Sequence, residues 1–187
     1  VLADDAEAPA VSPDGRVLAI TELVSGLDIT YRRDIALRNL ATGEVRRVTF
    51  PAWHTLAGDP VQDGPPWSPD GRRLVVRSDG IRVVGVDAGD VTSASVVPGT
   101  ASDGSRTPPL APVFLNDTTL AAYAGCCIGA GSLVSISLPD GHTRRLARVE
   151  APLRSIVRSP DSGRIALVTE LSGLFVWDGH RLRPVRR

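Results

Sequence analysis

The chain has 187 residues, 42% of them hydrophobic and only 4% aromatic, and its formal net charge is zero. This length suits one globular domain, so we expect a single domain over residues 1–187. The balanced charge provides no bulk attraction to nucleic acid or to an anionic membrane, and no apolar run is long enough to span a bilayer. A nucleic-acid partner and a membrane span in this chain are therefore not expected.

A short polar phrase recurs in near copies along the chain. It reads Ser-Pro-Asp-Gly-Arg at 12–16 and at 68–72, Ser-Pro-Asp-Ser-Gly-Arg at 159–164, and is reduced to Leu-Asn-Asp-Thr at 115–118. Proline presets φ, aspartate caps its own backbone and glycine accepts a positive φ, so each full copy predicts a tight turn. A β-prone apolar run follows each copy. Self-similarity at roughly 40–50 residues with short strands indicates the blades of a β-propeller.

Each repeat divides into four expected strands, a to d, with the Ser-Pro-Asp turn between a and b and a glycine turn between c and d. The first repeat has expected strands at 8–11, 17–23, 34–40 and 44–50. In the second, a strand ending at Trp67 precedes strands at 73–78, 81–86 and 92–97. The third has 112–115, 119–124, 133–138 and 143–149, and the fourth has 155–158, 164–170, 174–177 and 181–185.

The two turn signals recur in phase, and no segment shows a long apolar stripe of helical period. We therefore expect an all-β fold: a β-propeller of four-stranded antiparallel blades with about four blades present, at approximately 8–50, 64–97, 110–149 and 155–187. The alternative is a β-sandwich with glycine-rich turns.

Two blocks, 67–74 (Trp-Ser-Pro-Asp-Gly-Arg-Arg-Leu) and 40–49 (Leu-Ala-Thr-Gly-Glu-Val-Arg-Arg-Val-Thr), resemble the TolB-like, WD-like β-propeller repeats of bacteria. The resemblance extends over the whole chain at the level of the repeat and implies the fold rather than one function. Such repeats occur in periplasmic scaffold proteins, in the propeller caps of prolyl-oligopeptidase-like peptidases and in exported bacterial proteins. It implies that this chain is exported, although a cytoplasmic location stays open.

The number of blades departs from the pattern of the family, whose members usually close a ring of six to eight. Four blades close a ring by themselves in some propellers. Otherwise they form an arc of a longer chain, or self-association with a second copy completes the propeller.

Binding is expected on the face where the b–c and d–a connections emerge, because these are the long ones and long loops on a rigid scaffold usually carry function. The candidate partner-binding residues there are Tyr31, Arg32, Arg33, Trp53, His54, Cys126 and Cys127. Trp53 and His54 are the preferred contacts, since an exposed tryptophan anchors partners well. The alternatives are that Trp53 folds back between blades and that Arg32 and Arg33 are a solvated pair. Trp67 and Trp177 are expected in the core between blades.

No catalytic, cofactor-binding or metal-binding residue is predicted. Adjacent Cys126 and Cys127 cannot easily reach one metal ion, and they are either free thiols or a strained disulfide. His142 and His180 each follow a turn glycine and are expected to be exposed on the face opposite His54. The sequence contains no Gly-x-Ser-x-Gly, HExxH or phosphate-loop motif.

The favoured function is therefore a non-enzymatic β-propeller domain that binds a protein or peptide partner, without a cofactor. The alternatives are the propeller portion of a hydrolase or peptidase, and a small-ligand-binding propeller.

Overall fold

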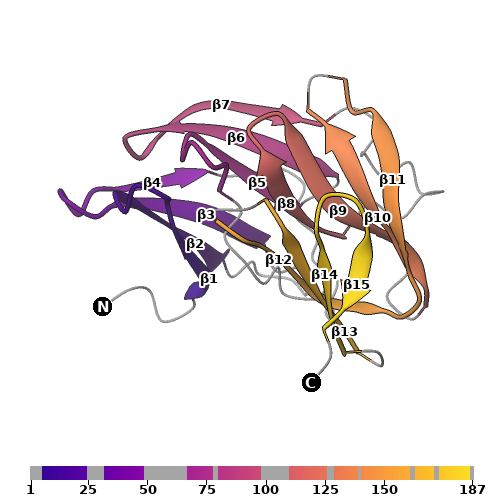
Figure 1. The fold of residues 1–187 in the computed structure, drawn as a ribbon. Coiled ribbons are helices and arrows are strands. Elements are labelled where there is room, and N and C mark those ends of the chain that lie inside the picture. Colours follow the sequence, from indigo (N-terminus) through magenta and orange to yellow (C-terminus); the bar gives the residue numbers. More distant parts are fainter. Residues whose placement is uncertain are drawn as a thin grey trace.

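The computed structural model describes residues 6–24, 32–48, 67–77, 80–97, 110–125, 129–138, 140–160, 163–170 and 173–185. Strands and turns make up these segments, and none of them contains a helix. The strands form four separate antiparallel sheets set around a common centre, which is the arrangement of a four-blade β-propeller (Figure 1). The predicted β-propeller fold is confirmed. The alternative, a two-layer β-sandwich, is not the observed arrangement.

Each blade is a meander in which consecutive strands pair. The first blade contains β1 (Ala6–Val11), β2 (Val17–Val24), β3 (Arg32–Asn39) and β4 (Val45–Val48). The second contains β5 (Arg73–Arg77), β6 (Ile81–Asp87) and β7 (Asp90–Val96), and Trp67 adds a single bridge to Leu74. The third contains β8 (Leu110–Asn116), β9 (Thr119–Gly125), β10 (Gly131–Ser137) and β11 (Thr143–Val149). The fourth contains β12 (Leu153–Arg158), β13 (Ile165–Thr169), β14 (Gly173–Trp177) and β15 (Leu182–Pro184).

Arg32 and Arg33 correct one predicted boundary. They were expected in the connection between the second and third strands, but they begin β3, where Arg32 pairs with Val24 and Arg33 with Leu23. Backbone hydrogen bonds continue a ladder whatever the side chain, so polar residues can extend a strand beyond its apolar stretch. The prediction from hydrophobic pattern alone began this strand too late, at residue 34 instead of Arg32.

Three apolar clusters join neighbouring blades, because successive side chains of a strand point to opposite faces of the sheet. In β9, Ala121 and Tyr123 pack with the fourth blade, whereas Leu120 and Ala122 pack with the second. The first and second blades are joined through Val17, Ala19, Ile35, Leu37, Leu74, Val76, Val84 and Val86. Trp67 and Trp177 lie in these clusters, as predicted, and are 6% and 8% exposed.

The outer flank of the fourth blade is apolar and uncovered. Val168 and Leu174 lie on it and are 37% and 42% exposed. They alternate along their strands with residues that pack on the third blade, and Val168 pairs directly with Leu174. Among the clusters formed by the described residues, none joins the fourth blade to the first.

The two kinds of tight turn lie at the same end of the blades. The N–H of Leu40 donates to the carbonyl of Arg16, that of Val86 to Arg72, and that of Leu138 to Thr118, at 2.7–2.9 Å. Each bond joins an a–b turn to the c–d turn of its own blade. We call this end the turn face, formed by the described residues 12–16, 40–44, 68–72, 88–89, 117–118, 138, 140–142, 159–160, 163–164 and 178–181. The remaining connections leave from the opposite end, the connection face, as the repeat pattern predicts.

Candidate functional site

The repeated phrase folds into the same hydrogen-bonded turn in the first two blades. The hydroxyl of Ser12 donates to Asp14 Oδ1 at 2.6 Å and accepts from the N–H of Val17 at 2.9 Å. The same oxygen of Asp14 accepts from the N–H of Arg16 at 3.1 Å. Gly15 has a φ of 74°, which glycine adopts without strain. The side chains of Ser12 and Asp14 therefore accept hydrogen bonds from the backbone N–H groups of the turn.

Turns of adjacent blades also contact one another. The side chain of Ser68 donates to Asp70, as in the first copy, and the N–H of Asp70 donates to Asp117 Oδ1 of the third blade at 3.2 Å. On the outer part of the same face, Asn39 Nδ2 donates to the carbonyl of Ala88 at 3.2 Å. The turn face is consequently tied across the first three blades by polar contacts as well as by the cores beneath it.

The turn aspartates have lowered pKa values. Hydrogen bonds from the Ser12 hydroxyl and the Arg16 N–H hold the pKa of Asp14 below its usual 3.8. Burial raises the pKa of Asp70, but the hydrogen bonds from Ser68 and Arg72 outweigh it and leave the pKa lowered. In the glycine turns, the backbone N–H of His142 lowers the pKa of Asp140. The backbone N–H groups of Arg181 and His180 lower the pKa of Asp178.

Acidification is therefore expected to destabilise the protein. A carboxylate with a lower pKa in the folded state contributes stability above its unfolded pKa, and this stability is lost as the pH falls through the folded pKa. We expect the melting temperature to fall below pH of about 4. Asp70→Asn should have a lower melting temperature than the wild type at neutral pH. The difference between the two melting temperatures should narrow toward pH 3. Asp87→Asn, at an exposed strand end, controls for the lost charge. A difference in melting temperature between Asp70→Asn and the wild type that does not change with pH contradicts the prediction.

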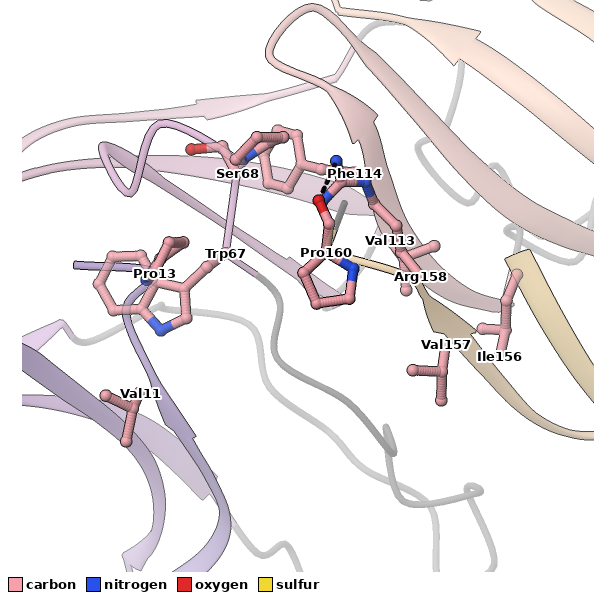
Figure 2. Close-up of a pocket in the computed structure, with 11 residues that line it drawn as sticks. Val11, Pro13, Trp67, Ser68, Val113, Phe114, Ile156, Val157, Arg158 and Pro160 are labelled. Carbon is pink, nitrogen blue, oxygen red and sulfur yellow. Dashed lines mark hydrogen bonds between the residues drawn. The ribbon is translucent and has the colours of Figure 1, made fainter. Parts of the chain in front are cut away.

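A cavity of about 210 Å³ lies where the inner strands of the four blades converge at the turn face (Figure 2). Its apolar walls are Val11, Trp67, Val113, Phe114, Ile156 and Val157. Pro13, Pro69 and Pro160, one from each copy of the Ser-Pro phrase, line it together with Ser68. Each blade contributes at least one side chain, so only the assembled propeller forms the cavity.

Arg158 is the one charged residue among the described residues that line the cavity. Its Nη2 donates to the carbonyl of Pro160 at 3.3 Å, a contact drawn in Figure 2. Its Nε is buried and is the only buried side-chain nitrogen or oxygen among the described residues that has no hydrogen-bond partner. A guanidinium is always charged and cannot accept hydrogen bonds, so this nitrogen can be satisfied only by an acceptor.

Sequence reasoning did not single out Arg158, although the repeat contains a signal for it. The residue immediately before each copy of the phrase is Val11, Trp67, Phe114 and Arg158 in turn. Three copies have an apolar side chain at this position, and the fourth has a cation. Comparing the copies position by position identifies the exception, but only the structure shows that this position faces the cavity in all four of them.

The structure describes only two of the predicted partner-binding residues. Tyr31, Trp53, His54, Cys126 and Cys127 are outside the described residues, and Arg32 and Arg33 are placed only as the first residues of β3. The connections that contain the outside residues begin and end at the connection face, opposite the cavity. Arg32 and Arg33 begin β3 at that end, so the structure does not bring these two residues together with Arg158.

His142 and His180 are exposed in c–d turns, as predicted, and their N–H groups donate to Asp140 and Asp178. Within the described segments, no three His, Cys, Asp or Glu side chains are grouped so that they could hold a metal ion. The same segments contain no helix of the length and apolarity needed to cross a membrane.

No protein-family model and no curated protein sequence matches the chain. Solved propeller structures do match. TolB from Acinetobacter baumannii is 19% identical with a TM-score of 0.60, and the match covers 91% of this chain and 40% of TolB. A Mycobacterium tuberculosis puromycin-hydrolysing peptidase is 19% identical with a TM-score of 0.61, covering 93% of this chain and 30% of the peptidase. The C-terminal WD40 domain of Sif2 is 14% identical with a TM-score of 0.59, covering 93% and 43%.

These likenesses define the class of protein by fold. The chain is a β-propeller with TolB-like and WD40-like neighbours, which include both peptidases and proteins of the WD40 class. It spans less than half the length of the three structures just described. The predicted recognition of the fold is confirmed.

Proposed function

We propose that this chain is a non-enzymatic binding or scaffold domain that recognises a protein or peptide partner through its connection face. One observation carries the proposal: the blades end in tight turns at one face, while the connections spanning residues 25–31, 49–66 and 98–109 all join strand ends at the other. Long connections on a rigid β scaffold supply the varied surface that recognition needs. The likeness to the Sif2 WD40 domain supports a protein partner.

Trp53 and His54 are the proposed main contacts, with Tyr31, Arg32, Arg33, Cys126 and Cys127 around them. Arg32 and Arg33 begin β3 at the connection-face end, which is consistent with a place at the edge of such a surface. Tryptophan and arginine contribute disproportionately to interface energies because they combine large contact areas with directed donors.

A comparative pull-down from the native source tests this proposal. The baits are the wild type, the Trp53→Ala/His54→Ala double variant, and a His142→Ala/His180→Ala control on the exposed turn face. We expect proteins recovered with the wild type to be retained by the control and reduced at least tenfold with the Trp53/His54 variant, the loss of about 1.4 kcal/mol or more that a contact of this kind contributes. Equal recovery with the three baits refutes the choice of contact residues.

The alternative is the propeller portion of a hydrolase or peptidase, in which the propeller supports chemistry performed by another domain. The likeness to the M. tuberculosis peptidase favours it. An α/β-hydrolase segment encoded in the same reading frame would support this alternative over the first.

Two further properties belong to the proposal. The uncovered flank of the fourth blade, with Val168 and Leu174, supports self-association with a second copy. Sedimentation velocity of the wild type, with Val168→Asp as the control, tests this self-association.

The likeness to TolB supports an extracytoplasmic location. Fractionation of the native source tests this location.

A further inference from the structure

We infer that the cavity at the turn face is a second binding site, separate from the connection face, and that it takes a carboxylate attached to an apolar body. The donor for the carboxylate is Arg158, and the apolar side chains around it hold the body. The ligand is either a small free carboxylic acid or the C-terminal residue of a peptide with an apolar side chain.

The apolar part of the argument rests on uncovered side chains at the centre of the fold. Val11 and Val157 belong to innermost strands, where a propeller normally buries its side chains, yet they are 51% and 43% exposed. Both line the cavity, opposite each other in the first and fourth blades. A ligand that covers them gains the free energy of removing apolar surface from water.

The polar part rests on Arg158. It lines the cavity, and none of the described residues that line the cavity with it is an aspartate or a glutamate. Its buried Nε has no acceptor, and its Nη2 is held by the carbonyl of Pro160. A carboxylate offers two acceptor oxygens in the geometry that matches a guanidinium, and it also neutralises the charge. An amide or an alcohol offers the hydrogen bond without the charge and is expected to bind less well.

The size of the cavity limits the ligand. About 210 Å³ accommodates one side chain or a short alkyl or aryl group rather than a folded partner. Three prolines line the cavity and fix φ in its wall, which limits how far this wall can adjust to a larger body.

Isothermal titration calorimetry of the whole chain tests the inference with three acids and their three matched amides. N-acetyl-leucine and the free acid 4-methylpentanoate are titrated beside their amides, and a tetrapeptide ending in leucine is titrated beside its C-terminal amide. We expect the acids to bind at least tenfold more tightly than the matched amides. Binding of the tetrapeptide acid identifies a peptide C terminus as the ligand, and binding of only the small acids identifies a free acid. Equal binding of acids and amides, or no binding of any acid, overturns the inference.

Two variants separate the charge from the cavity. Arg158→Met keeps the length and the apolar stem but removes the donors, and it should weaken acid binding at least tenfold without changing amide binding. Val157→Trp keeps Arg158 and fills the cavity from a half-exposed position, and it should abolish both. Circular dichroism spectra like the wild type confirm that each variant is folded. If the acids still bind to Arg158→Met and to Val157→Trp as they bind to the wild type, the site lies elsewhere. The Trp53→Ala/His54→Ala variant should bind the acids normally, so a failed pull-down and a failed titration remain distinguishable.

Discussion

Replacing Gly131 with alanine is expected to destabilise the protein by about 1–3 kcal/mol, because the third blade has no room for a Cβ there. The added atom would lie 2.6 Å from Tyr123 Oη and 2.8 Å from the carbonyl oxygen of Ala124. Tyr123 cannot easily move aside: its side chain is fully buried, and its hydroxyl donates to the carbonyl of Gly129 at 2.8 Å. Backbone and ring must therefore both shift, in a sheet whose neighbouring strands are paired on either side.

Gly129→Ala is the matched control for this prediction. A Cβ at Gly129 would meet nothing within 4 Å, and the carbonyl that Tyr123 uses is unaffected by the substitution. We expect a change within about 0.5 kcal/mol. The free energies of unfolding are measured by urea denaturation of the wild type and both variants. Equal losses in the two variants would show that the effect comes from glycine flexibility rather than from the contact with Tyr123.

Trp67→Ala is expected to cost about 3–5 kcal/mol, the range observed when a buried aromatic side chain is deleted from a core. Trp67 packs in the cluster between the first two blades, and its Nε1 donates to the carbonyl of Ala10 at 3.0 Å. The bond is buried and joins residues of different blades, so its loss removes both packing and a polar connection across the seam. Because Trp67 makes only a single bridge to β5, little backbone pairing compensates.

Trp67→Phe separates these two contributions. It keeps an aromatic ring but removes the N–H donor, so the loss should be smaller than for alanine and should include about 1 kcal/mol from the missing hydrogen bond. Leu40→Ala, at a turn residue that is 46% exposed, should change stability by less than about 0.5 kcal/mol. Urea denaturation measures all three. A Trp67→Ala variant as stable as Leu40→Ala would show that the first two blades do not depend on this seam.

The sequence predicts the strands well because the turns that bound them are local. Ser12, Asp14 and Gly15 make their hydrogen bonds within a few residues, so the phrase defines where a strand ends wherever it occurs. The start of β2 at Val17 and the end of β12 at Arg158, each next to a copy of the phrase, agree with the prediction. Where no such phrase bounds a strand, the prediction weakens, and the start of β3 at Arg32 is the example.

The candidate cavity could not be predicted in the same way. Its walls come from four blades, and the contact between Trp67 and Ala10 joins residues far apart in sequence. No local preference reports on such proximity. The Tyr123–Gly131 contact is of the same kind, because it depends on the register of two paired strands. Arg158 stands out in the repeat alignment, but its chemical meaning depends on the missing acceptor for its Nε.

The clusters between blades also bear on how such a protein can change during evolution. Each of the two internal sheets contributes one set of alternate residues to the preceding seam and the other set to the following one, as β9 does with Leu120 and Tyr123. Every internal unit therefore offers the same kind of two-sided surface to its neighbours. A duplicated unit can insert between two others and find compatible surfaces on both sides. The number of units can thus grow or shrink by gene duplication and loss, while the packing between the retained units is preserved.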